Sequence, residues 1–182
     1  MKSRAELIKA LTAYTTKFKE ERLLALQFLE LLKSAQCYYR DHLPGHITGS
    51  AWIVDEGRTH VLLIHHNNLN KWLQPGGHAD GDENVLNVAI REANEETGLT
   101  NLIQLTSGLF DLDIHPIPAR KAFPEHLHFD VRFLFQASRK DELKISEESS
   151  DLKWINLEEV PALTQNNPSI LRMIKKLEAI AN

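Results

Sequence analysis

The sequence lacks several features that would place it in a membrane, an oxidising compartment or a complex with nucleic acid. Cys37 is the only cysteine among 182 residues, which excludes an internal disulfide and fits a reducing compartment. No apolar run reaches membrane-spanning length, and residues 1–4 are not followed by the apolar core of a signal peptide. The net charge of −4 offers no general attraction to nucleic acid or to an anionic membrane. We therefore expect a cytoplasmic protein that acts on a small molecule, with no membrane and no nucleic acid duplex as partner.

What the sequence does contain is an ordinary globular composition, long enough for one substantial core with an extension. Residues 3–39 carry apolar side chains at helical spacing, and Pro44 and Gly45 mark the end of this region. We predict an N-terminal helical extension over residues 1–43 and a main domain over residues 44–182. An extension this apolar packs either on the main domain or on a second subunit, which would form a homodimer.

The main domain has the pattern of a mixed α/β unit. Residues 46–64 predict two strands with a turn at Asp55, and residues 126–135 alternate strongly between apolar and polar side chains. The other expected elements are a strand over 102–112, a loop over 113–124, a strand over 152–155, and helices over 157–163 and 168–181. Strands on both sides of a central helix, with terminal helices, predict an α/β/α sandwich around a mixed sheet.

A loop and helix in mid-chain, residues 77–99, concentrate acidic groups. We expect the helix to begin after Asp82 as N-cap and to end at Gly98, where a residue at positive φ is favoured. Three carboxylates fall at i, i+3 and i+4 and meet within one turn, those of Glu92, Glu95 and Glu96. Because like charges this close repel, the cluster predicts a divalent cation, and hard oxygen ligands suit Mg²⁺ or Mn²⁺.

The spacing of these residues resembles the Nudix box. Gly77 is followed after five residues by Glu83, and after seven more by the run REANEETGL that starts at Arg91. Ala93 is smaller than the bulky aliphatic residue that the pattern usually carries. The chain is therefore similar to the Nudix (MutT-like) hydrolases, loosely over residues 46–160. The resemblance implies the α/β/α fold and a Mg²⁺-dependent hydrolase that cleaves a diphosphate bond in a nucleoside diphosphate linked to another moiety.

The box residues receive candidate roles from their charge and from the resemblance. The three clustered carboxylates are expected to hold the metal ion, with Glu95 and Glu96 essential for activity. The resemblance implies the Gly76 carbonyl as a further ligand. Glu83, expected about two turns earlier on the helix, suits an outer metal position, and Arg91 would orient a glutamate by a charge-assisted hydrogen bond. The alternative for the cluster is a solvated acidic face.

Candidate residues outside the box would complete hydrolysis, which needs an in-line water and neutralised phosphoryl charge. In this fold a glutamate from a distant loop sometimes serves as general base, and Glu148 is the candidate here; a solvated loop carboxylate is the alternative. Arg120 and Lys121 are candidates for contacts with substrate phosphates. Trp72, just before the box, is a third candidate substrate-binding residue.

Four of the nine histidines form a second pattern. His126 and His128 are i and i+2 on a strand and therefore share a face, His78 follows the box glycine, and His46 opens the first strand. This is similar to isopentenyl-diphosphate isomerase, an enzyme of Nudix fold with histidine metal ligands at the places of His46 and His78 and two acidic ligands spaced as His126 and His128 are here. The pattern predicts a second site for a transition metal such as Zn²⁺. The alternative is separate histidines on polar loops or in the substrate pocket.

Two functions other than hydrolysis remain open from the sequence. The histidines favour a prenyl-diphosphate isomerase, but that family lacks the full glutamate set and uses a cysteine beside the box, where this chain has Gly76 or Gly77. A non-catalytic nucleotide-sensing module commonly loses box glutamates, and none is lost here. The substrate stays open, because loops outside the box select it.

Overall fold

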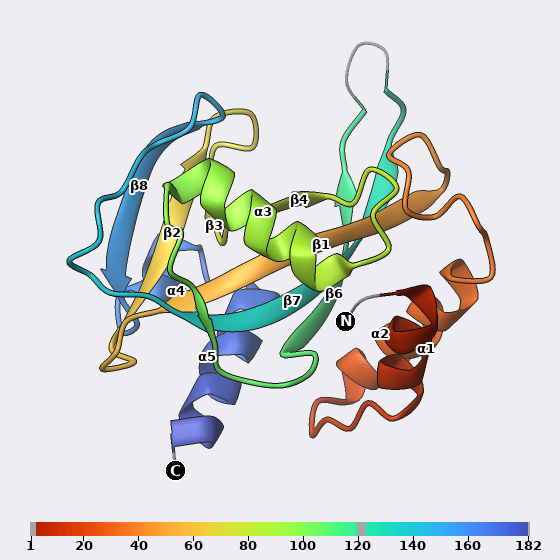
Figure 1. The fold of residues 1–182 in the computed structure, drawn as a ribbon, viewed down its shortest axis with the longest axis horizontal. Helices are drawn as coiled ribbons and strands as arrows, with labels where there is room; N and C mark the ends of the chain where they lie inside the picture. Colours follow the sequence, from red (N-terminus) through yellow and green to blue (C-terminus); the bar gives the residue numbers. More distant parts are fainter. Residues whose placement is uncertain (1–2, 120–122, 182) are drawn as a thin grey trace.

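A computed structural model describes residues 3–119 and 123–181, whose arrangement is shown in Figure 1. Within these residues, helices surround one eight-stranded sheet. The strands are β1 (Gly45–Val54), β2 (His60–His66), β3 (Lys71–Leu73), β4 (Gly76–His78), β5 (Ile103–Gln104), β6 (Asp111–Ile117), β7 (His126–Gln136) and β8 (Ser149–Asn156). The helices are α1 (Arg4–Thr12), α2 (Lys19–Leu31), α3 (Val85–Thr97), α4 (Val160–Leu163) and α5 (Pro168–Ala181). Among the residues described, no helix combines the length and the apolar character needed to cross a bilayer.

The sheet is mixed, because β1 runs parallel to β7 and antiparallel to β2 and β4. Its strand order is β3-β2-β1-β7-β5, with β4 on β1, β6 on β7 and β8 on β2. β1 pairs with β2 at Ile53 and Val54, but with β4 at residues 48–50. The two long strands therefore diverge from their shared hairpin, and the segment that leads into α3 is fixed against β1.

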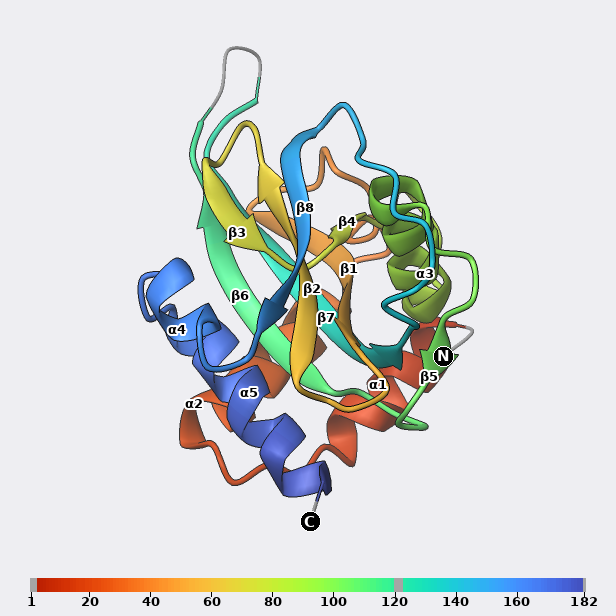
Figure 2. The ribbon, with the colours of Figure 1, turned by 90° about the vertical axis from the view of Figure 1, so that its left-hand side faces the viewer.

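Alternation along the strands sorts the apolar side chains into two cores, one on each face of the sheet. On β1, Ile47 and Ile53 belong to the core that includes α3, whereas Trp52 and Val54 belong to the core formed with α4 and α5. Figure 2 shows α3 on one side of the sheet and α4 and α5 on the other. Helices on both faces of a mixed sheet confirm the predicted α/β sandwich.

The N-terminal helices pack on the main domain. Leu7 and Phe28 are fully buried in the same core as α3, and the Phe28 ring meets the Phe129 ring of β7 edge-on at 5.3 Å between centroids. The opposite face of α2 exposes Leu23 and Leu26, with 61% and 63% of their surface accessible. The homodimer therefore stays a prediction, and this exposed face of α2 is where it would form.

The extension is not the continuous helix that residues 3–39 predicted. It is interrupted between α1 and α2, and turns follow α2. Thr16 lies in the interruption, where its hydroxyl accepts from the backbone N–H of Phe18 at 3.2 Å and donates to Glu21 at 2.6 Å. Such local side-chain bonds compete with the helical hydrogen bonds of the backbone.

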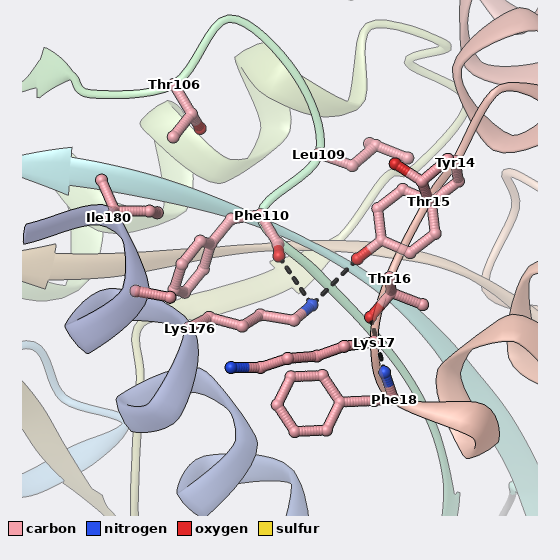
Figure 3. A pocket seen from close by; sticks show the side chains of 11 residues that line it. Tyr14, Thr15, Thr16, Lys17, Phe18, Thr106, Leu109, Phe110, Lys176 and Ile180 are labelled. Carbon is pink, nitrogen blue, oxygen red and sulfur yellow. Dashed lines mark hydrogen bonds between the residues drawn. The ribbon is translucent and has the colours of Figure 1, made fainter. Parts of the chain in front are cut away.

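Glu21 is fully buried and ties α2 to the opposite end of the chain. Its carboxylate accepts from the Tyr14 hydroxyl at 2.5 Å and from the Leu112 N–H at 3.0 Å, and it pairs with Lys176 of α5. Figure 3 shows the Lys176 ammonium between the Tyr14 hydroxyl and the Phe110 carbonyl, on the wall of a cavity of about 220 Å³. The described residues that line this cavity include none from the 77–99 segment, so we assign it no part in catalysis.

Strand β6 begins within the predicted strand and continues through residues 113–117, for which the sequence predicted a loop. It pairs antiparallel with β7 from Asp111 opposite Arg132 to Ile117 opposite His126. Pro116 fits because, within the described residues, β6 has β7 as its one neighbour, and an edge strand tolerates a missing N–H donor. The strand predicted over residues 102–112 is divided in two, since Ile103 and Gln104 form β5, whereas Asp111 and Leu112 begin β6.

Candidate functional site

Helix α3 carries the acidic cluster, and its ends are set by local side-chain and backbone preferences. Its N-cap is Asn84, whose side chain accepts from the Asn87 N–H at 3.2 Å. The prediction of Asp82 as the N-cap is wrong. The Asp82 carboxylate accepts a hydrogen bond from the Asn84 N–H at 2.8 Å and stabilises the turn that precedes the helix. At the other end Gly98 has a φ of 76°, which confirms the predicted left-handed residue.

One face of α3 packs closely on β1, which leaves another face for the acidic side chains. Val85 and Ala89 are fully buried, and a Cβ on Gly49 of β1 would lie 2.8 Å from the Val85 carbonyl oxygen. Ala93 is also fully buried, so the small residue at this position is accommodated by the tight contact between helix and sheet. This packing holds α3 beside the glycine loop.

The glycine loop, Gly76 and Gly77 at the start of β4, approaches the acidic cluster so closely that a side chain on Gly77 would displace a carboxylate. A Cβ on Gly77 would lie 2.5 Å from the carboxyl carbon of Glu92. The Gly76 N–H donates to a carboxylate oxygen of Glu96 at 2.8 Å. Loop and helix therefore form one unit in which two of the three clustered carboxylates face backbone.

Arg91 joins the cluster to β4. Its guanidinium contacts the carboxylates of Glu92 at 2.8 Å and Glu95 at 3.2 Å, and it donates to the His78 carbonyl at 2.8 Å. These contacts restrict both glutamates by charge-assisted hydrogen bonds.

The electrostatics of the cluster favour a bound cation. Burial raises the pKa of Glu96 to about 8, and the negative charges of Glu92, Glu148 and Glu95 add to that rise against the Gly76 N–H. Burial also raises the pKa of Glu92, against the opposing charge of Arg91. Carboxylates that are crowded and partly dehydrated in this way are a donor set that fits a hard divalent ion such as Mg²⁺ or Mn²⁺.

Glu83 has a different position from the one expected. It precedes α3 instead of lying on it, and both the backbone N–H and the guanidinium of Arg4 reach its carboxylate at 3.1 Å. This residue therefore links the box to the N-terminal extension, a contact that spans 79 positions of sequence.

Glu148 lies on the loop before β8 and lines a second cavity of about 330 Å³. The same cavity is lined by Arg40 and His78. The negative charge of Glu148 contributes to the raised pKa of both Glu92 and Glu96, so this distant loop carboxylate acts electrostatically on the cluster. The described residues that line this cavity include none of the three clustered carboxylates, and His78, whose carbonyl accepts from Arg91, connects the cavity to the cluster.

Arg40 was not a candidate from the sequence. It pairs with Asp80 through an Nε to Oδ1 hydrogen bond of 2.7 Å and lines the same cavity as Glu148. Its neighbourhood in the sequence is a polar turn without periodicity, so no sequence signal distinguishes it from an exposed surface arginine.

The other candidate substrate residues differ in how they are placed. Trp72 lies on β3 and packs beside the core formed with α4 and α5, with its ring 5.3 Å from that of His65 and 5.6 Å from the Lys153 ammonium. It does not line the cavity that contains Glu148. Arg120 and Lys121 fall outside the described residues.

The four predicted histidines lie together. Each of His46, His78, His126 and His128 offers one ring nitrogen, and these four atoms lie within 4.8 Å of one another. Burial lowers the pKa of His46 and His78 to about 4, and it lowers the pKa of His128 further. These three imidazoles are therefore neutral near pH 7, the form that can bind a metal ion.

The hydrogen bonds of this cluster leave ring nitrogens without partners. The Nδ1 atom of His126 contacts the Pro124 carbonyl at 2.9 Å, and the Nδ1 atom of His46 contacts the His42 carbonyl at 3.5 Å. Among the described residues, the Nε2 atoms of His46 and His128 are buried without a hydrogen-bond partner. An unsatisfied buried polar atom costs about 1–3 kcal/mol.

Comparison with known proteins decides the family. The NUDIX domain model matches residues 45–177, which is most of the chain. The chain belongs to the Nudix family. This confirms the resemblance inferred from the box, and the enzyme is a Nudix hydrolase.

Curated relatives of this Nudix hydrolase are enzymes that act on nucleotides or pterin phosphates. A probable DHNTP pyrophosphohydrolase of Lactococcus lactis subsp. cremoris is 28% identical over 140 residues, which cover 75% of this chain and 81% of that protein. The asymmetrical bis(5'-nucleosyl)-tetraphosphatase of Rattus norvegicus is 31% identical over 108 residues, 58% of this chain and 69% of that protein.

A solved structure of similar fold is a C. elegans Ap4A hydrolase in a binary complex. It has a TM-score of 0.61 and 20% identity, and the match covers 74% of the Nudix hydrolase described here and 96% of that chain. The part of the chain outside these matches includes most of the N-terminal extension, since the family match begins at residue 45.

Proposed function

We propose that this Nudix hydrolase depends on Mg²⁺ or Mn²⁺ and cleaves a diphosphate bond in a nucleoside diphosphate linked to another moiety. The observation that carries the proposal is the complete set of Glu92, Glu95 and Glu96 beside the glycine loop, with the pKa of Glu96 raised to about 8. Hydrolysis of a diphosphate needs negative charge neutralised at the phosphoryl oxygens, and this cluster can hold the cations that do so.

The residues of the box would divide the work of holding the metal. Glu92, Glu95 and Glu96 are the proposed ligands, the Gly76 carbonyl is a further one, and Glu83 an outer one. A bound ion would polarise the phosphoryl group and lower the pKa of a water molecule. Arg91 fixes two of these carboxylates and the His78 carbonyl, so that the ligands are oriented before the ion arrives.

Glu148 is the proposed general base. It lines the cavity that His78 also lines, and its negative charge contributes to the raised pKa of Glu92 and Glu96. A carboxylate in this position can accept a proton from a water molecule that attacks the diphosphate. Arg40, on the same wall, is placed to bind a phosphate, and Arg120 and Lys121 remain candidates for that role, as Trp72 does for substrate binding.

The printed activities of the relatives order the substrates to be tested. Bis(5'-nucleosyl) tetraphosphates fit the proposed class, because each holds a nucleoside diphosphate joined to a second phosphorylated nucleoside. DHNTP, the substrate named for the bacterial relative, comes next. Nucleotide sugars, coenzyme A, ADP-ribose and nucleoside triphosphates complete the panel, each with Mg²⁺ and with Mn²⁺.

Substitutions in the cluster test the proposal. Glu95→Gln and Glu96→Gln should each lower turnover by about a hundredfold or more, because each removes a carboxylate that would hold the cation needed to neutralise the phosphoryl charge. Without metal, their melting temperatures should equal or exceed that of the wild type, since each removes repulsion between carboxylates. Glu142→Gln, on an exposed loop, is the matched control and should keep full activity. Unimpaired turnover in both cluster variants would refute the assignment, and product analysis would separate hydrolysis from isomerisation of a prenyl diphosphate.

A further inference from the structure

We propose that His46, His78, His126 and His128 form a transition-metal site, of the kind that binds Zn²⁺ through imidazole nitrogens and is separate from the carboxylate cluster. The four candidate ligand atoms lie within 4.8 Å of one another. A tetrahedral zinc ion with bonds of about 2.0–2.1 Å holds its ligands about 3.3 Å apart, so shifts of about 1 Å in the rings suffice to close the site.

The backbone of the sheet brings these histidines together before any ion binds. His46 and His128 are direct neighbours on the parallel strands β1 and β7, and His126 shares their face two residues earlier. His78 on β4 pairs opposite Thr48 of β1. Ligands supplied by three hydrogen-bonded strands lose little freedom on binding, which favours a preorganised metal site over a loose surface cluster.

The ring contacts suggest what the cluster is built to hold. His46 is at the centre, with its ring centroid 5.1, 4.9 and 5.0 Å from those of His78, His126 and His128. It is 1% exposed, and its Nε2 atom has no hydrogen-bond partner among the described residues. The Nδ1 atoms of His46 and His126 each contact a backbone carbonyl. Because a carbonyl can only accept a hydrogen bond, the ring proton of each of these two histidines lies on Nδ1. This leaves Nε2 as the ligand atom, a pattern typical of metal-binding histidines.

The donor type separates this site from the acidic cluster. Imidazole nitrogen favours Zn²⁺, Cu²⁺ or Ni²⁺, whereas carboxylate oxygen suits Mg²⁺. Because no carboxylate is among the four ligands, a bound Zn²⁺ would keep its charge of +2 on the wall of the cavity that Glu148 and Arg40 also line. Since His78 directly follows Gly77, such an ion would also tie the box loop to β1 and β7.

Metal analysis of the untagged full chain tests the site without substrate, so its result is independent of the proposed hydrolase activity. The protein is stripped with a chelator, incubated with excess Zn²⁺ or Co²⁺, and freed of unbound metal by gel filtration. We expect about one equivalent of metal per chain, the visible absorption of tetrahedral Co²⁺, and a higher melting temperature with Zn²⁺ than without. Absence of retained metal after incubation with excess would overturn the proposal.

Variants locate the ion. His128→Gln and His78→Gln should each lose the bound Co²⁺ spectrum and the stabilisation by Zn²⁺; both residues are only partly buried, and each variant remains informative if the other does not fold. His60→Gln, at the first residue of β2, is the matched control and should retain one equivalent. Glu96→Gln should also retain it, because it belongs to the other cluster. Unchanged metal content in a folded histidine variant, or its loss in Glu96→Gln, would overturn the proposal.

Discussion

A single missing Cβ decides how closely the loop before α3 approaches the acidic side chains. At Gly77 the added atom would meet the carboxylate of Glu92, which is the far end of a flexible side chain. At Gly76 it would lie 2.1 Å from the hydroxyl oxygen of Ser50 and 2.8 Å from its Cα, where the backbone cannot move aside cheaply. The two neighbouring glycines therefore have different purposes: Gly76 lets the strands pack, and Gly77 leaves room for a candidate metal ligand.

We expect Gly77→Ala to reduce activity far more than stability. The methyl group would displace the Glu92 carboxylate, and a misplacement of about 1 Å in a catalytic group can cost about a hundredfold in rate. The melting temperature should stay near that of the wild type, because a flexible side chain yields. Gly108→Ala is the control, since a Cβ there meets nothing within 4 Å. Steady-state kinetics and thermal unfolding of both variants check this, and a fully active Gly77→Ala enzyme would contradict it.

At the scale of elements, the N-terminal helices are held to the main domain by both apolar packing and a buried ion pair. Glu21 of α2 and Lys176 of α5 are 155 positions apart in sequence, and both are buried or nearly so. Breaking such a pair from one side leaves an uncompensated charge in a dry environment. The buried face of the extension therefore attaches it to the main domain, and its exposed face is left for the predicted second subunit.

Glu21→Ala should destabilise the folded chain by about 3–5 kcal/mol, because the Lys176 ammonium would keep only Asp111 as a carboxylate partner, at 2.8 Å, and the Tyr14 hydroxyl and Leu112 N–H would lose their buried acceptor. The neighbouring Glu20→Ala is exposed and should change the free energy of unfolding by about 0.5 kcal/mol or less. Urea denaturation of the two variants measures the difference. Equal unfolding midpoints would show that the ion pair does not anchor α2.

At the scale of the whole molecule, buried charges connect α5, β6 and β7. Asp111 is fully buried, and its carboxylate forms ion pairs with the guanidinium groups of Arg172 at 2.8 Å and Arg132 at 3.1 Å. Burial alone would raise the pKa of Asp111, but the hydrogen bond from Arg172 and the charges of Arg132 and Lys176 hold it below the ordinary value. The ionised carboxylate thus favours the folded state.

This network predicts a loss of stability in acid. A carboxyl group whose pKa is depressed by folding contributes fully above its unfolded value of about 3.9, and the contribution falls as the pH drops below that value. The free energy of unfolding of the wild type should therefore decrease below about pH 4. Asp111→Asn, less stable throughout, should show a shallower decrease over the same range. Urea unfolding between pH 7 and pH 3 measures the free energy of unfolding of both proteins. An equal decrease below pH 4 in the wild type and in Asp111→Asn would contradict the prediction.

Local sequence was sufficient to predict the parts of the site that depend on neighbouring residues. The spacing of Glu92, Glu95 and Glu96 predicted one helical face, and Gly98 predicted the end of that helix, because helical geometry and backbone preferences act over a few positions. The same reasoning chose Asp82 over Asn84 as N-cap, since either side chain can cap a helix. It also missed the break at Thr16, where a local side-chain bond outweighs helical periodicity.

Tertiary structure alone decided which distant residues meet. The chain determined by itself the acidic helix, the glycine loop, the alternation of β7 and the family, because these are encoded in short-range spacing. It did not determine that β6 would pair along β7, that Arg40 would share a cavity with Glu148, or that Arg4 would bind Glu83. Such contacts depend on strand register and on how α3 and α5 pack. Both are set by the free energy of the whole fold, which no local pattern specifies.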